Sequence, residues 1–144
     1  MANILHDFPI AAPPDAVFRA ITTPDGLNEW WTLTSHGSPS LGADYALGFG
    51  PSYQWHAKVT ELTAARAFEM EITGADADWQ GTRVGFRLSP RPDGGTLVAF
   101  RHTGWASVNA HFRTSNCCWA MYLRILRRYL EHGERVPYEK RLDV

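Results

Sequence analysis

A long stretch near the end of the chain, residues 109–132, contains neither glycine nor proline and is followed directly by Gly133. Mostly apolar side chains recur in it at intervals of three and four residues, which predicts an amphipathic α-helix. At 1.5 Å per residue, such a helix would be on the order of 30 Å long, enough to cross a whole sheet. Gly133 is well suited to cap its C-terminus. The predicted inward stripe consists of His111, Ser115, Cys118, Trp119, Tyr122, Leu126, Tyr129 and Leu130.

The residues before this helix follow a different pattern, in which apolar and polar side chains alternate. Alternation with a period of two is typical of strands that bury one face. Turn-forming residues such as those at 92–95 separate the strands, which indicates an antiparallel meander. In the third of the strands below, Glu69 and Glu71 lie opposite the apolar face, and we expect both to face water. The expected strands cover residues 45–49, 53–62, 67–73, 82–89 and 96–102, after an opening strand over residues 4–10.

Two short helices are expected between the opening strand and the meander. Proline followed by an acidic residue, at Pro14 and again at Pro24, is typical of a helix N-terminus. Residues 32–43 are rich in Gly, Ser and Pro and are expected to form a loop. The sequence thus predicts the α+β class: a curved antiparallel sheet of about six strands, two short helices and one long C-terminal helix. We expect residues 1–144 to form a single domain, irregular from about residue 134.

Charge and composition exclude several classes of protein. With 14 Lys and Arg against 15 Asp and Glu, the net charge of −1 argues against nucleic-acid binding. No apolar run is long enough for a membrane span, and the N-terminus does not resemble a secretory signal. The only two cysteines, Cys117 and Cys118, are adjacent, which argues against disulfides and a zinc site. We therefore expect a cytoplasmic protein with no metal and no cofactor.

Four segments, in this order, carry a resemblance to a known family. The first, residues 12–31, reads APPDAVFRAITTPDGLNEWW, and residues 55–62 read WHAKVTEL. Residues 100–105 read FRHTGW, and residues 118–133 run from Cys-Trp to His-Gly. Together they resemble the START/SRPBCC helix-grip superfamily, most closely the group related to the C-terminal domain of the Aha-type activator of a heat-shock-protein ATPase. The resemblance implies a hydrophobic cavity between the sheet and the long helix.

Nine side chains are candidates for lining such a cavity, although each could equally be ordinary core. They are Trp30, Trp31, Trp55, Phe86, Phe100, His102, Trp105, Trp119 and Tyr122. Neighbours on a helix point about 100° apart, so one of Trp30 and Trp31 is expected to be partly exposed. His102 shares a strand face with apolar residues; it is either a satisfied core histidine or a polar group at the cavity mouth, where His111 could approach it.

The leading functional hypothesis is the binding of a small hydrophobic or aromatic molecule in this cavity, without catalysis. One alternative, implied by the superfamily, is a polyketide cyclase or hydratase-like enzyme in which His102 and Tyr122 orient the substrate. Another is a co-chaperone-like interaction domain; because the chain lacks the additional N-terminal domain of the full-length eukaryotic activators, we do not expect chaperone stimulation. A homodimer is a possible assembly.

Overall fold

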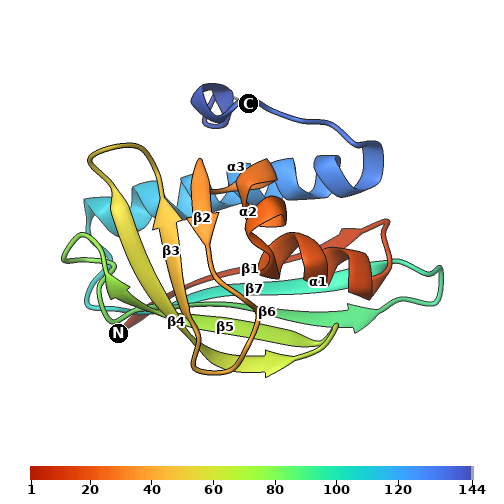
Figure 1. Cartoon of the computed structure of the whole chain (residues 1–144), viewed down its shortest axis with the longest axis horizontal. Helices are drawn as coiled ribbons and strands as arrows, with labels where there is room; N and C mark the ends of the chain where they lie inside the picture. Colours follow the sequence, from red (N-terminus) through yellow and green to blue (C-terminus); the bar gives the residue numbers. More distant parts are fainter. Residues whose placement is uncertain (144) are drawn as a thin grey trace.

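In the computed structural model, which describes residues 1–143, all strands belong to one curved antiparallel sheet (Figure 1). The strand order across this sheet is β1-β7-β6-β5-β4-β3-β2, so β1 and β2 form its edges. The elements follow the chain as β1 (Ala2–Ile10), α1 (Pro14–Thr22), α2 (Pro24–Trp30), β2 (Thr34–His36), β3 (Asp44–Gly48), β4 (Gln54–Thr63), β5 (Ala67–Gly74), β6 (Arg83–Pro90), β7 (Thr96–Trp105), α3 (Ala110–His132) and the 3-10 helix η1 (Tyr138–Lys140).

The predicted α+β class and order of elements are confirmed, with one strand more than the six expected. The additional strand is β2, which lies in the segment predicted as a loop and pairs with β3. Its three residues are too few to show an alternating pattern, so the sheet edge rather than local sequence determines this strand. Ser35 at its centre is buried, and its hydroxyl donates to Asn28 Oδ1 at 2.9 Å.

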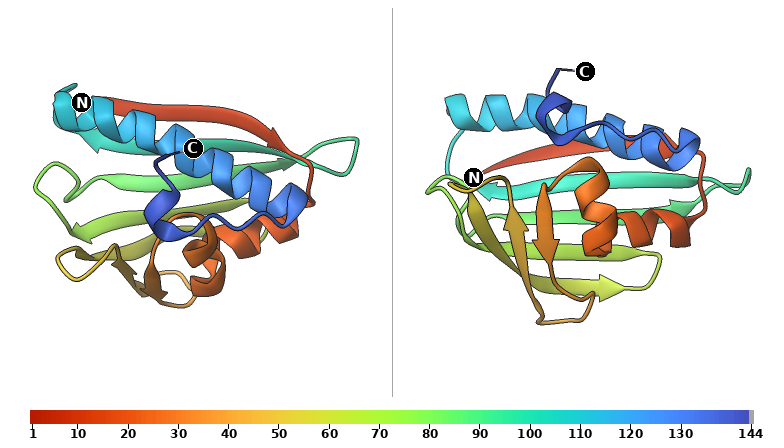
Figure 2. Two further views of the ribbon diagram at one scale, coloured as in Figure 1. Left: turned by 90° about the horizontal axis from the view of Figure 1, so that it is seen from above. Right: turned by 45° about the horizontal axis from the view of Figure 1, so that its top comes forward.

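The long helix α3 runs across one face of the sheet, and α1 and α2 lie beside it on the same face (Figures 1 and 2). Asn109 caps its start, because the Asn109 side chain accepts a hydrogen bond from the backbone N–H of Phe112 at 2.9 Å. Gly133 ends it in the left-handed conformation, with φ of 65°. Side chains such as Val98 and Leu126 between these layers are fully buried. No helix within residues 1–143 is long and apolar enough to cross a membrane.

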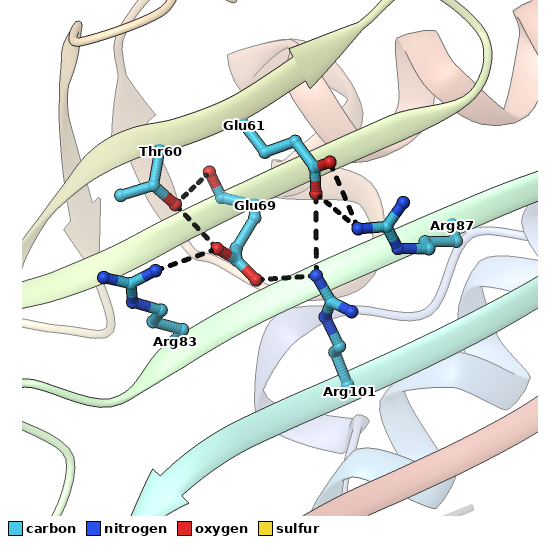
Figure 3. A network of polar contacts seen from close by, with 6 residues as sticks. All are labelled: Thr60, Glu61, Glu69, Arg83, Arg87 and Arg101. Atoms are coloured by element: carbon cyan, nitrogen blue, oxygen red, sulfur yellow. Dashed lines mark hydrogen bonds and ion pairs between the residues drawn. The ribbon is translucent and has the colours of Figure 1, made fainter.

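The opposite face of the sheet carries a network of charged side chains across β4, β5, β6 and β7 (Figure 3). Glu69 lies at its centre: one carboxylate oxygen is 2.9 Å from Arg101 Nη2, and the other accepts a 2.9 Å hydrogen bond from the Thr60 hydroxyl. Arg83 approaches the same carboxylate at 3.5 Å. The expectation that Glu69 faces water was therefore wrong. It points outward, but the neighbouring side chains cover it and leave only 8% exposed.

After α3 the chain turns back and passes beside α2 toward the β2–β3 end of the sheet (Figure 2). The predicted irregular tail contains the short helix η1 and is attached through Arg141, whose side chain is buried. The Arg141 guanidinium donates to the backbone oxygens of Asn28 at 2.6 Å and Thr32 at 3.1 Å. These carbonyls lie at the end of α2, where backbone oxygens have no hydrogen-bond donor within the helix. Arg141 of the tail supplies that donor.

Candidate functional site

A cleft of about 310 Å³ lies between α3, the β3–β4 hairpin and the tail. This volume is at the lower end of the range for small-molecule sites. One wall is a single face of α3, and the other walls come from four separate segments of the chain. The lining residues are Trp31, Phe49, Tyr53, Trp55, Asp76, Trp79, His111, Thr114, Ser115, Cys118, Trp119, Tyr122 and Tyr138.

Aromatic side chains form most of this lining, eight of the thirteen residues. Their rings hold one another in place. Trp31 packs on Trp119 with ring centroids 5.1 Å apart, and on Phe49 at 5.5 Å. Trp55 packs on Trp79 at 4.9 Å and on Phe49 at 5.2 Å. Because these wall rings support one another, most of the cleft wall is preformed and a ligand would order few side chains on entry.

The tail contributes Tyr138 to the rim. The Tyr138 hydroxyl donates to the backbone oxygen of Phe49 at 3.2 Å and so joins the tail to the β3–β4 hairpin. Burial raises the pKa of Tyr138, and burial also lowers the pKa of Arg141, which lies over the Tyr138 ring at 5.5 Å. The C-terminal tail, through Tyr138, therefore forms this side of the cleft.

Tyr122 lies on the cleft-facing side of α3, at the end nearest to Tyr138. Burial raises the pKa of Tyr122 to about 12, and the neighbouring Tyr138 adds to this effect. The phenol therefore stays neutral over the physiological pH range and keeps its O–H as a hydrogen-bond donor.

His102 lies behind the cleft wall and is completely buried. Trp119 Nε1 donates to His102 Nδ1 at 3.0 Å, so His102 carries its proton on Nε2, which is 2.8 Å from Thr82 Oγ1. The Thr82 hydroxyl in turn donates to the backbone oxygen of Trp79. Burial, and then the nearby His111, lower the pKa of His102 to about 3. His102 is thus a neutral group whose two ring nitrogens are already engaged, and it supports Trp119 from behind.

The structure brings four of the nine candidate residues together on the cleft wall: Trp31, Trp55, Trp119 and Tyr122. It places the other five in the core: Trp30, Phe86, Phe100, His102 and Trp105. The expectation that Trp30 or Trp31 is partly exposed was wrong, because both are buried, at 0% and 2% exposed. Trp30 donates from Nε1 to the backbone oxygen of Ala20 at 2.9 Å, while Trp31 follows the last helical residue and turns toward the cleft.

Several lining residues were not among the candidates. His111, Ser115 and Cys118 belong to the stripe that helical periodicity predicted, so the signal for them was present. Phe49 and Tyr53 flank a turn, and Tyr138 lies in the tail, where no periodic pattern indicates a direction. Within residues 1–143, no three His, Cys, Asp or Glu side chains come together in a way that could hold a metal ion.

A curved antiparallel sheet that holds a long C-terminal helix, with a hollow between them, defines the helix-grip class of protein. Residues 11–131 match the family described as Activator of Hsp90 ATPase homolog 1-like protein, and the chain belongs to this family. Among curated proteins, none matches the chain significantly.

Solved structures agree with this assignment. The chain is 31% identical to the Aha1 dimer from Colwellia psychrerythraea, with a TM-score of 0.84 over 93% of this chain and 99% of that one. The protein MLL2253 from Mesorhizobium loti is 17% identical, with a TM-score of 0.80 over 92% and 99% of the two chains. CalU16 from Micromonospora echinospora is 21% identical, with a TM-score of 0.76 over 98% and 84%. The last two share the fold.

Proposed function

We propose that this protein binds a small hydrophobic or aromatic molecule in the cleft between α3 and the β3–β4 hairpin. The observation that carries the proposal is the lining itself, in which eight aromatic rings surround about 310 Å³. Flat rings offer large contact areas at a small cost in conformational entropy, and the Tyr and Trp rings also carry polar groups that can orient a ligand.

The adjacent cysteines provide a matched test of this proposal. Cys118 lines the cleft at its middle, whereas Cys117, one residue earlier, is exposed outside it. Cys118→Phe would place a ring in the hollow, and Cys117→Phe would add the same ring on the surface. We expect compounds from a library of small fluorinated aromatic and aliphatic molecules, followed by ¹⁹F NMR, to bind wild type and Cys117→Phe but not Cys118→Phe. The proposal is wrong if no compound binds wild type, or if the compounds that bind wild type bind Cys118→Phe equally well.

The geometry does not favour the cyclase-like alternative that uses His102 and Tyr122. Tyr122 lines the cleft, but His102 lies in the core with both nitrogens in hydrogen bonds to Thr82 and Trp119. With a pKa of about 3, the His102 imidazole is almost entirely neutral near neutral pH. It therefore lacks the second ring proton that a general acid would give, and it is too weak a base to act as a general base. Binding is therefore the function that this arrangement supports best.

We also propose that the protein forms a homodimer. The support is its 31% identity, over nearly the whole length of both chains, to a protein whose solution structure is that of a dimer. Sedimentation velocity over a range of micromolar concentrations should show a species of twice the chain mass. A monomer throughout that range would contradict the proposal.

A further inference from the structure

The two ends of the cleft differ in their chemistry. Its α3 wall runs from His111 to Tyr122, three helical turns or about 16 Å. At the Tyr122 end the cleft is lined by rings, including Trp31 and Tyr138. At the other end, near the start of α3, the lining includes His111 and Ser115. Rings alone would accept many apolar molecules of the right size, whereas polar groups at this end can distinguish among them by hydrogen bonding.

His111 is held in one orientation by its neighbours. Its Nδ1 is 3.0 Å from Asp78 Oδ2, and the other oxygen of Asp78 accepts a 3.3 Å hydrogen bond from the Asn109 side chain. The Trp105 ring packs edge-on against the imidazole, with centroids 5.6 Å apart. Because an ionised carboxylate only accepts hydrogen bonds, Nδ1 carries the proton that bridges to Asp78. In the neutral ring, Nε2 is then an acceptor, and it has no partner among residues 1–143.

Ser115 offers the complementary group one helical turn further on. Only 6% of this residue is exposed, and its oxygen accepts a hydrogen bond from Trp79 Nε1 at 3.3 Å. The hydroxyl hydrogen has no acceptor within the described part of the chain, so it remains available to a molecule in the cleft. Side chains four residues apart on a helix are neighbours, about 5–6 Å between Cβ atoms. His111 and Ser115 are therefore neighbours on the one face of α3 that lines the cleft.

We infer that His111 and Ser115 form a subsite for the hydroxyl group of an aromatic ligand, so that the cleft prefers hydroxyarenes to unsubstituted arenes. This inference rests on the proposed binding function. A phenolic hydroxyl satisfies both groups with one oxygen: its hydrogen donates to His111 Nε2, and its oxygen accepts from Ser115. The rings of Trp31, Trp55 and Trp119 hold the aromatic part. An ether or fluoride at the same position would leave His111 Nε2 without a donor.

The test compares 6-fluoro-2-naphthol with 2-fluoronaphthalene, two probes that differ in one hydroxyl. Each is kept at low micromolar concentration, and protein is titrated while ¹⁹F NMR follows the bound fraction. We expect the naphthol to bind about tenfold more tightly to wild type, as two modest hydrogen bonds would give. His111→Phe, which keeps a ring against Trp105, and Ser115→Ala should each reduce that preference to threefold or less. Asn116→Ala, at an exposed neighbouring position on α3 outside the cleft lining, should leave it unchanged.

The possible outcomes separate this inference from the broader proposal. Equal affinity of the two probes for wild type would overturn the hydroxyl subsite while leaving ligand binding intact. A tenfold preference that survives both His111→Phe and Ser115→Ala would also overturn it. Absence of naphthol binding, while other compounds bind in a manner sensitive to Cys118→Phe, would do the same. The wild-type comparison needs no variant, so the inference can fail even if one substitution prevents folding.

Discussion

At the scale of single residues, His102 shows how burial determines what a titratable group can do. It lies on an apolar strand face, between Trp119 and Thr82, and its pKa is lowered to about 3. Between that value and the ordinary pKa of about 6.5, the unfolded chain binds a proton at His102 that the folded chain does not. Acid therefore favours unfolding through this residue.

We predict that the free energy of unfolding falls as the pH is lowered from about 6.5 toward 4, by up to about 1.4 kcal/mol per pH unit from His102 alone. His102→Gln removes the titration while keeping a polar side chain beside Thr82 and Trp119. Its unfolding free energy should depend less steeply on pH than that of wild type. Urea denaturation at a series of pH values measures both slopes, and equal slopes would contradict the pKa shift.

Ser115 makes a second point at this scale. The Ser115 hydroxyl accepts a hydrogen bond from Trp79 Nε1 at 3.3 Å. This bond links α3 to the connection between β5 and β6. Sequence periodicity predicted that Ser115 faces inward, but no sequence pattern could pair it with an indole 36 positions away. The same holds for His111 and Asp78. Helical spacing locates a side chain on a face, whereas its partner depends on how the loops are folded.

At the scale of elements, the four strands β4 to β7 are joined on their outer face by the network around Glu69 (Figure 3). Each of its bonds crosses between strands, and removal of Glu69 would leave Arg101 and Arg83 without this carboxylate. The arginines are partly exposed, so water compensates for some of the loss.

We predict that Glu69→Gln lowers the free energy of unfolding by about 1–2 kcal/mol, because a buried charged hydrogen-bond acceptor is replaced by a neutral amide. Glu71→Gln is the matched control, since Glu71 lies on the same strand and the same face but is only half-buried. Its effect should stay within about 0.5 kcal/mol. Chemical denaturation at neutral pH measures both, and equal effects would contradict a special role for Glu69.

The tail is the element that the sequence described least well. Its residues are polar and non-periodic, which predicted an irregular segment, yet Arg141 is 5% exposed and bonded to carbonyls at the end of α2. An arginine becomes buried in this way because the last carbonyls of a helix require donors, and nothing in the local sequence shows that those carbonyls lie nearby.

We predict that Arg141→Ala detaches the tail from α2. Amide exchange of residues 134–143 should become faster, and the free energy of unfolding should fall by about 1–3 kcal/mol, because buried carbonyls lose their donors. Lys140→Ala, at an exposed neighbouring position, should change neither quantity. Unchanged exchange in Arg141→Ala would show that other contacts hold the tail.

At the scale of the whole molecule, the sequence predicted the layered fold because the two hydrophobic periods, of two and of about 3.6 residues, occupy separate parts of the chain. The sheet has one apolar face, and the C-terminal helix has the only long apolar stripe, so each can be buried only by packing against the other. The cleft was predictable in principle but not in its outline, since its walls combine α3 with Trp31, Phe49, Trp79 and Tyr138 from distant segments.

Ligand binding should be visible in the stability of the whole protein. At a free concentration of 6-fluoro-2-naphthol 100 times its dissociation constant, the free energy of unfolding should rise by about 2.7 kcal/mol. In thermal unfolding followed by circular dichroism, the transition should move up by several degrees for wild type and Cys117→Phe. Cys118→Phe should show no rise, and a rise equal to that of wild type would place the binding site elsewhere.

The position of the two thiols has a practical consequence. Cys118 faces the hollow, where burial and then the neighbouring Cys117 raise its pKa, while Cys117 is open to solvent. A small alkylating reagent should therefore modify Cys117 first, and an occupant of the hollow should shield Cys118 alone. After alkylation, a mass spectrum of the peptide that holds both sulfurs would therefore distinguish ligand-bound from ligand-free protein: one modified cysteine indicates an occupied cleft, and two indicate an empty one.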